Sequence, residues 1–304
     1  MSKNKIIVIL GQTSTGKSDF AVGVAKKIDG EIISADSRQV YKGMDLGTGK
    51  ITKKEMRGVP HHLLDVVNPK KIFSVSDFKK LADKKIEEIL TRGKIPIICG
   101  GTGFYIDAVV DGTILPEVPP NKNLRAVLSK KSAEQLFVML KKLDPTRAKN
   151  IDAKNKVRLI RAIEIAKALG HVPSLASDGI NTKYQVLKIG LMLPDELLKG
   201  RIYARLLARI KKGMLGEIKN LHKQGISWKR MEQLGLEYRY GALYLQGKMN
   251  RKEMMEKINT ESWHYAKRQK TWFKRDKNII WIDPRKVNLK SFDVKVRKYL
   301  ELFL

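Results

Sequence analysis

The sequence predicts an α/β fold in which helices flank a parallel β-sheet and a mainly helical subdomain is inserted into the chain. Short apolar runs of the kind found in buried strands alternate with longer stretches of helical period. The first apolar run, at residues 6–10, leads directly into Gly-Gln-Thr-Ser-Thr-Gly-Lys-Ser at residues 11–18. A strand that runs into a loop with this G-x-x-x-x-G-K-S spacing indicates a P-loop NTPase-like sheet.

The elements of the predicted sheet follow one another in chain order. Residues 19–27 have helical period directly after the loop, and a longer helix from about residue 76 to 92 is ended by Gly93. Both helices stand between apolar runs, as expected when helical crossovers connect parallel strands. We expect the buried strands at residues 6–10, 31–35, 95–99 and 186–193.

A proline-rich segment at residues 115–120 marks a domain boundary, because three prolines in six positions cannot continue a helix or a central strand. Helical periodicity resumes beyond it, for example at residues 133–143 and 156–169, and from Asp195 onward the pattern is again mostly helical. We therefore expect a P-loop core formed by residues 1–115 and 182–304, with an inserted helical subdomain at 116–181.

The loop at residues 11–18 combines several groups that bind anions. Gly11 and Gly16 allow a sharp reversal of the chain, so that backbone N–H groups and a helix N-terminus point at one spot. Lys17 adds a positive charge there, and the Ser18 hydroxyl is the expected protein ligand of a Mg²⁺ cofactor. The predicted diphosphate-binding residues are Gly11, Thr13, Ser14, Thr15, Gly16, Lys17 and Ser18. The loop alone does not decide which kind of molecule carries the diphosphate.

Two further polar residues follow predicted strands. Asp36 comes directly after the strand at 31–35, and Thr102 follows the strand at 95–99. Ligands of doubly wound sheets bind at the carboxyl ends of the strands, so both residues should lie beside the phosphate loop. From position alone, Asp36 is a catalytic carboxylate, an N-cap or part of a magnesium site. Thr102 either contacts a ligand or satisfies a turn.

The composition is strongly basic, with 61 Lys and Arg against 31 Asp and Glu and a formal net charge of +30. Lys and Arg placed against phosphates release counterions, so this charge predicts a nucleic-acid partner, with a generally lysine-rich proteome as the alternative. Arg201, Arg205 and Arg209 recur every four residues along one predicted helix. Residues 265–275 interleave basic and aromatic side chains, as in segments that follow nucleic-acid backbones.

Cysteine and apolar content bound the cellular context. The single cysteine, Cys99, allows neither a disulfide framework nor a multi-cysteine zinc site. The sequence shows no signal-peptide pattern and no apolar run of about eighteen residues. We therefore expect a cytoplasmic protein with no membrane partner. The neighbouring His61 and His62 have no cysteine nearby and are predicted to be structural.

Several blocks of sequence resemble the tRNA dimethylallyltransferase (isopentenyltransferase) family, in order along nearly the whole chain. The blocks are residues 33–50, 58–65, 73–78, 100–105, 155–164, 201–205 and 266–272. Two positions depart from the pattern: Gln12 stands where the family commonly has proline, and residues 234–240 replace a more usual Ile-Gly-Tyr block. We expect neither departure to touch the chemistry.

The resemblance implies a reaction. Dimethylallyl diphosphate is the implied donor, and its C5 unit moves to the exocyclic amine of the adenosine 3′-adjacent to the anticodon in tRNA, releasing diphosphate. Arg205 is implied to reach the diphosphate, with Thr13 and Lys17 of the loop beside it. Asp36 is implied to accept the proton of the weakly nucleophilic amine. The implied catalytic residues are thus Asp36, Arg205, Thr13 and Lys17.

The resemblance also implies a partner, the tRNA anticodon stem-loop, and we expect the protein to be a monomer. A base stacked in that loop cannot reach a buried phosphate site, so it has to be flipped out, and the inserted subdomain is implied to clamp the loop. The predicted tRNA-binding residues are Asp36, Ser37, Arg38, Gln39, Thr102, Arg125, Arg158, Leu159, Ile160, Arg161, Ala162, Lys267 and Arg268.

Three other functions are compatible with parts of the pattern. An ATP-dependent nucleoside or small-molecule kinase would use the phosphate loop and Asp36, but would leave the charge and the insertion unexplained. An RNA-binding module without chemistry would explain the charge, but not why Asp36, Thr102 and Arg205 converge on the loop. A prenyltransferase acting on free AMP would be expected to have a less basic surface.

Overall fold

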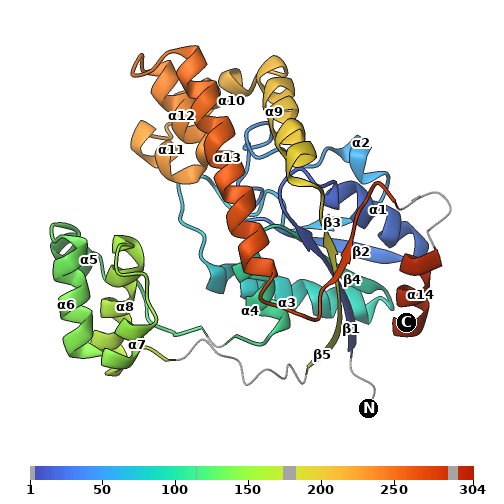
Figure 1. Cartoon of the computed structure of the whole chain (residues 1–304), viewed down its shortest axis with the longest axis horizontal. Helices are drawn as coiled ribbons and strands as arrows, with labels where there is room; N and C mark the ends of the chain where they lie inside the picture. The colour runs from blue at the N-terminus through green and yellow to red at the C-terminus, as the bar shows by residue number, and fades with distance from the viewer. Residues whose placement is uncertain (1–3, 114, 174–182, 287–293) are drawn as a thin grey trace. The chain divides into compact units, whose positions relative to one another are not determined.

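The structure is a computed structural model in which two compact units can be recognised (Figure 1). It describes residues 4–113, 115–173, 183–286 and 294–304. The first unit comprises Met1–Asp111 and Asn181–Leu304, and the second comprises Gly112–Ile180. The division thus falls after Asp111, where the sequence predicts a boundary after residue 115. Within the described ranges, no helix is both long enough and apolar enough to cross a membrane.

The first unit is built on a parallel sheet whose strands, among the described residues, lie in the order β3-β2-β4-β1-β5-β6. The strands are β1 (Asn4–Gly11), β2 (Gly30–Ala35), β3 (His61–His62), β4 (Ile95–Gly100), β5 (Tyr184–Leu191) and β6 (Ile280–Ile282). All of the paired strands run parallel. The predicted α/β class is therefore confirmed. The sequence pattern does not predict β3 and β6, because they are too short to show a strand period.

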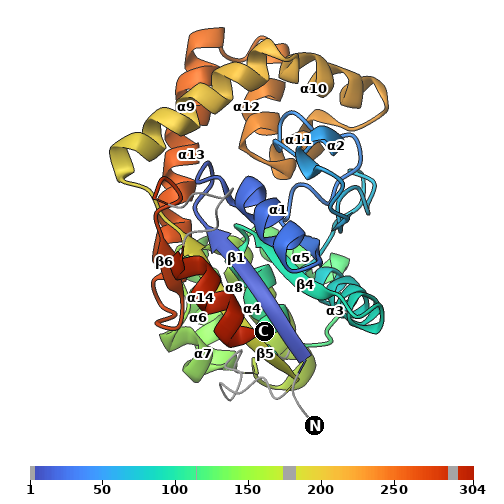
Figure 2. The same cartoon turned by 90° about the vertical axis from the view of Figure 1, so that its right-hand side faces the viewer.

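Helices cover both faces of the sheet (Figure 2). The helices concerned are α1 (Lys17–Lys27), α3 (Val75–Thr91), α4 (Gly103–Val110) and α14 (Val294–Phe303). Ile7 and Ile9 of β1 pack with α1 and α14, whereas Ile6 and Val8 pack with α3 and α4 on the other face. Because successive strand residues point to opposite faces, one continuous apolar run serves both layers.

Two helix starts follow from the local sequence. α1 begins at Lys17, immediately after Gly16, whose φ of 92° lies in the left-handed region. The phosphate loop therefore ends at a helix N-terminus, as its motif predicts. α3 begins with a capping box, in which Ser74 accepts from the Asp77 N–H and the Asp77 carboxylate accepts from the Ser74 N–H.

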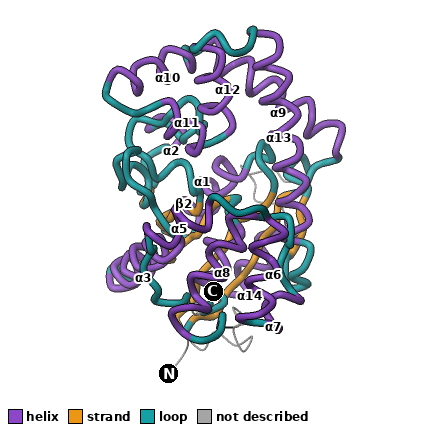
Figure 3. Tube along the Cα trace, turned by 90° about the vertical axis from the view of Figure 1, so that its left-hand side faces the viewer, coloured by secondary structure: helices purple, strands orange, loops and turns teal. Residues whose placement is uncertain are grey.

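A bundle of helices completes the first unit beyond the carboxyl ends of the strands (Figure 3). Its members are α9 (Asp195–Lys211), α10 (Met214–Lys223), α11 (Trp228–Leu234), α12 (Leu236–Leu245) and α13 (Arg251–Phe273). Their shared core includes Ile218, Tyr238 and Met254, together with Val40 and Met44 from the segment that follows β2. The bundle therefore packs against the chain between β2 and the short helix α2 (Lys53–Met56).

The second unit is helical and has an apolar core of its own. It contains α5 (Lys122–Ser129), α6 (Ala133–Leu143), α7 (Pro145–Lys149) and α8 (Lys156–Leu169). Leu136 and Leu140 of α6 pack against Leu159 and Ile163 of α8. The carboxylate of Glu164, only 2% exposed, accepts hydrogen bonds from Arg125, Arg161 and the Asn121 N–H.

Candidate active site

The ends of three neighbouring strands carry the residues that the sequence predicted to converge. β2, β4 and β1 are adjacent in the sheet, and they end before Asp36, before Thr102 and in the phosphate loop. A cavity of about 560 Å³ lies at this edge. Its lining includes Thr13, Ser14, Gly16, Lys17, Ser18, Asp36, Gln39 and Arg205, whereas Thr102 is not part of it. The structure thus brings the four predicted catalytic residues to one cavity.

The phosphate loop is folded back on its own backbone. The carbonyl of Gln12 accepts hydrogen bonds from Lys17 Nζ at 2.6 Å and from Thr15 Oγ1 at 2.8 Å. Burial lowers the pKa of Lys17 to about 8; Arg205 acts in the same direction, while Cys99 and Asp36 oppose it. The positive charge of Lys17 is therefore only partly compensated by neighbouring groups, as expected of a lysine that binds an anion.

Two glutamines connect the phosphate loop to α13. Gln12, which is 2% exposed, donates from Nε2 to the carbonyl of Ala266 at 3.1 Å. Gln269 accepts from the Thr13 N–H at 2.8 Å and donates to the carbonyl of Gly101 at 2.8 Å. Gln12 thus accepts from Lys17 through its backbone carbonyl, which any residue at this position would offer, and binds α13 through its side chain. That the Gln12 departure leaves the chemistry untouched stays a prediction.

The turn after β2 is organised by Asp36 and Thr102. Asp36 Oδ1 accepts the backbone N–H groups of Arg38 at 2.8 Å and Gln39 at 3.3 Å. Thr102 Oγ1 accepts the N–H of Ser37 at 3.1 Å and also bonds the hydroxyl of Tyr265. One oxygen of Asp36 thus holds the turn; residues 37–40 form no helix, so Asp36 is not an N-cap. Asp36 Oδ2 accepts none of the hydrogen bonds found among the described residues.

Arg205 enters the cavity from α9. Its Nη2 donates to the carbonyl of Gly49 at 3.0 Å, and Gln39 Nε2 reaches the same oxygen at 3.4 Å. Burial, followed by the charge of Arg209, lowers the pKa of Arg205 to about 10. The guanidinium is still protonated at neutral pH, so Arg205 and Lys17 place two cations in one cavity.

The family model described as IPP transferase matches residues 39–276. The chain belongs to the IPP transferase family. It is 46% identical over 285 residues to the tRNA dimethylallyltransferase 2 of Treponema denticola, covering 92% of this chain and 95% of that protein. It is 42% identical to the corresponding protein of Trichlorobacter lovleyi, covering 93% of each. The family resemblance of the sequence is thus confirmed.

Solved structures agree with this assignment to the IPP transferase family. The full-length tRNA isopentenylpyrophosphate transferase of Bacillus halodurans is 36% identical with a TM-score of 0.71, and the match covers 99% of this chain and 95% of that one. A eukaryotic dimethylallyltransferase acting on tRNA is 25% identical with a TM-score of 0.77, over 98% of this chain and 77% of that one.

The predicted tRNA-binding residues of the second unit differ in accessibility. Leu159 is fully buried and Ala162 is 4% exposed, so both residues belong to the core of that unit and offer almost no surface to a ligand. Arg158 is exposed. Arg125 and Arg161 both pair with Glu164, at 2.7 and 2.5 Å, and are thereby held in fixed positions.

The remaining predicted tRNA-binding residues lie in the first unit. Lys267 and Arg268 are exposed on α13, where they stand over the rings of Trp263 and Tyr265 at 5.8 and 6.0 Å. Arg38 donates to the carbonyl of Gln233 at 3.2 Å. These groups remain predicted contacts, with side chains that reach the surface of the IPP transferase fold.

Sequence reasoning did not assign a role to several residues around the cavity. Tyr265 and Gln269 line the cavity, yet both lie in residues 265–275, whose basic and aromatic pattern predicts contact with a nucleic-acid backbone. Both are polar residues at helix positions that face the sheet. The periodicity of the sequence alone does not distinguish such a position from one on the surface. His61 also lines the cavity, and its Nδ1 lies 2.8 Å from the Val59 carbonyl.

Proposed function

We propose that the chain transfers the dimethylallyl group of dimethylallyl diphosphate to the exocyclic amine of the adenosine 3′-adjacent to the anticodon in tRNA, releasing diphosphate. The names of its relatives support the donor and the acceptor. The observation that carries the proposal is the presence of Lys17 and Arg205 at one cavity with Asp36. These residues supply two cations for a leaving anion and one carboxylate for a proton.

The chemistry follows from where charge develops. As the bond between the allyl carbon and the diphosphate oxygen breaks, negative charge grows on the diphosphate, and the loop N–H groups, Lys17 and Arg205 stabilise it. The adenosine nitrogen forms the new bond to carbon and loses a proton, which Asp36 accepts. Thr13 stands in the same loop, with its N–H already held by Gln269. Because that N–H is occupied, Thr13 can contribute its hydroxyl. Lys17 and Arg205 are held in place before the reaction, and preorganised donors cost little reorganisation during it.

Mg²⁺ fits this site as a partner of the diphosphate. Among the described residues, no group of three or more His, Cys, Asp or Glu side chains could hold a metal ion. Magnesium in phosphate sites commonly takes one or two protein ligands and completes its shell with phosphate oxygens and water. Ser18, exposed at the start of α1, is the hydroxyl that would hold it. The ion would neutralise charge on the leaving group.

The basic surface supports tRNA as the partner. We also propose that the protein is a monomer and that it acts in the cytoplasm. Lys267 and Arg268 of α13 and Arg158 of α8 supply exposed cations on both units. Phosphate contacts of this kind provide affinity that falls steeply with salt. The acceptor adenosine has to be flipped out of the anticodon loop to reach the cavity.

The decisive experiment offers radiolabelled dimethylallyl diphosphate and Mg²⁺ to the protein with unmodified tRNA and with AMP in parallel. We expect label in tRNA only. Lys17→Ala should reduce the rate by about 100-fold, the scale of losing a charge-stabilising donor, while Lys26→Ala, an exposed lysine of the same helix, should not. Label in AMP would indicate a free-nucleotide acceptor, and label in neither, with phosphate transfer from ATP, would indicate a kinase.

A further inference from the structure

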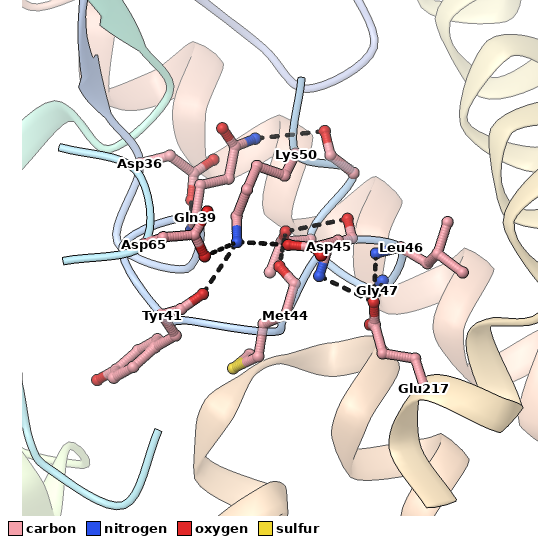
Figure 4. A network of polar contacts seen from close by, with 12 residues as sticks. Asp36, Gln39, Tyr41, Met44, Asp45, Leu46, Gly47, Lys50, Asp65 and Glu217 are labelled. Atoms are coloured by element: carbon pink, nitrogen blue, oxygen red, sulfur yellow. Dashed lines mark hydrogen bonds and ion pairs between the residues drawn. The ribbon is translucent and has the colours of Figure 1, made fainter. Parts of the chain in front are cut away.

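The loop of residues 44–50 forms one wall of the cavity, through Thr48 and Gly49. It lies between β2 and α2 and belongs to neither the sheet nor the helix bundle. Figure 4 shows this loop together with Glu217, which reaches it from α10. Neither the phosphate-loop motif nor the proposed reaction assigns a role to Glu217.

The carboxylate of Glu217 accepts hydrogen bonds from several backbone N–H groups of the loop. Its Oε2 accepts the N–H groups of Asp45 at 2.9 Å and Leu46 at 2.7 Å, and its Oε1 accepts the N–H of Gly47 at 3.0 Å. The hydroxyl of the buried Tyr238 donates to Oε1 at 2.7 Å. Hydrogen bonds to an ionised acceptor are stronger than neutral ones, so this end of the loop is firmly held.

The carbonyl side of the same loop faces the arginines of α9. Arg205 donates to the carbonyl of Gly49 at 3.0 Å, and Arg209 donates to the carbonyls of Gly47 at 3.3 Å and Thr48 at 3.4 Å. Arg209 is in turn paired with Glu237 at 2.8 Å. The backbone N–H groups of the loop therefore point at the carboxylate of Glu217, and its carbonyl oxygens point at the guanidinium groups of Arg205 and Arg209.

The block at residues 234–240, which departs from the family pattern, contributes to this support of the loop; that the departure leaves the chemistry untouched stays a prediction. That block supplies Glu237, the partner of Arg209, and Tyr238, the partner of Glu217. Both residues act on the loop that holds Arg205. Through the loop, this block is connected to the cavity, although most of it lies on a helix of the bundle.

We propose that Glu217 is a positioning residue for the reaction: by fixing the amide side of residues 45–47, it sets the Gly49 carbonyl that orients Arg205 toward the donor diphosphate. The inference rests on the proposed function of Arg205. The far end of the loop is anchored separately, since Lys50 Nζ bonds Asp45, Asp65 and the carbonyl of Tyr41. Loss of Glu217 would therefore loosen the loop without releasing it.

The test compares the full-length Glu217→Gln variant with Glu256→Gln, which removes the same charge from an exposed site on α13. Kinetics with dimethylallyl diphosphate and tRNA give kcat and KM, and calorimetry with inorganic diphosphate gives a readout without turnover. We expect Glu217→Gln to lower kcat/KM for the donor by about tenfold to about 100-fold, the scale of a misplaced transition-state contact. Its KM for tRNA and the behaviour of Glu256→Gln should match the wild type.

A double-mutant cycle separates positioning from a general effect on the fold. In an Arg205→Ala background, Glu217→Gln should cause no further loss of kcat/KM for the donor, because it acts through the removed side chain. Equal losses in both backgrounds, or wild-type kinetics of the single variant, would overturn the inference. Tyr238→Phe, which removes one donor, should show a smaller loss in the same direction. If the wild type transfers no label, the proposed function fails. The inference about Glu217 is then still tested by comparing the diphosphate binding of Glu217→Gln with that of the wild type.

Discussion

Lys17 provides a prediction in which donor affinity and stability respond to pH in opposite directions. Burial lowers its pKa from the usual 10.5 to about 8 in the free protein. This difference corresponds to about 3 kcal/mol, since each unit is worth about 1.4 kcal/mol. A bound diphosphate supplies the missing countercharge, so binding should raise the pKa of Lys17 back toward its usual value.

The sign of each effect follows from proton counting. Below about pH 7, Lys17 is protonated with or without donor, so affinity should be independent of this group. Above about pH 8, binding has to take up a proton, and affinity should fall by up to about tenfold per pH unit. The unfolded chain keeps its proton up to the usual pKa, so the free folded protein should instead gain stability as pH rises through this window.

Calorimetry of inorganic diphosphate with Mg²⁺ measures the proton uptake directly, if it is repeated in buffers that differ in their heat of ionisation. The matched variant is Lys17→Arg, because a guanidinium keeps its proton throughout the window and should flatten the pH dependence. The reasoning about Lys17 is refuted if the two proteins show the same slope between about pH 8 and about pH 9.5, or if the wild type takes up no proton.

Three other substitutions test separate parts of the structure. Asp36→Asn should lower kcat by at least about 100-fold, as for loss of a general base, with donor binding unchanged by calorimetry; near-normal turnover would contradict that role. Gly49→Ala should reduce kcat/KM for the donor, because φ is 60° and a Cβ would meet the guanidinium groups of Arg209 and Arg205. Gly247→Ala, also at positive φ but in open space, should not. Glu164→Gln should weaken tRNA binding by freeing Arg125, and should destabilise the fold by about 1–3 kcal/mol. Because the pKa of Glu164 is lowered to about 2, the stability difference between the two proteins should be full above the usual pKa of a glutamate and should vanish as the pH falls toward the lowered pKa. A difference that does not depend on pH would refute the ion-pair account.

The parallel sheet and the phosphate loop could be predicted because their signals are local. Ile6 to Leu10 form an unbroken apolar run, and the motif that follows specifies both a turn and a helix start. The placement of Asp36 beside that loop required only the rule that strand ends share an edge. Strand β3 has just two residues, and its existence depends on pairing with β2, which no local pattern encodes.

The support of the site was harder to predict for the same reason. Arg205 and Arg209 share a stripe, yet their partners Gly47, Thr48 and Gly49 are more than a hundred residues away in the chain. A carbonyl that accepts from an arginine leaves no mark on residue type. The buried Leu159 shows the converse case, because a family motif predicts a segment that contacts tRNA without saying which of its side chains reach the surface.

The two glutamine bridges make the shape of the phosphate loop conditional on a distant helix. A proline at position 12, as is common in the family, restricts the backbone through a covalent ring, and such a restriction survives heating. Gln12 has instead one side-chain hydrogen bond to α13, which exists only while that helix stays in place. The shape of the phosphate loop is therefore a property of the assembled tertiary structure, and the loop should lose its order in one step with α13.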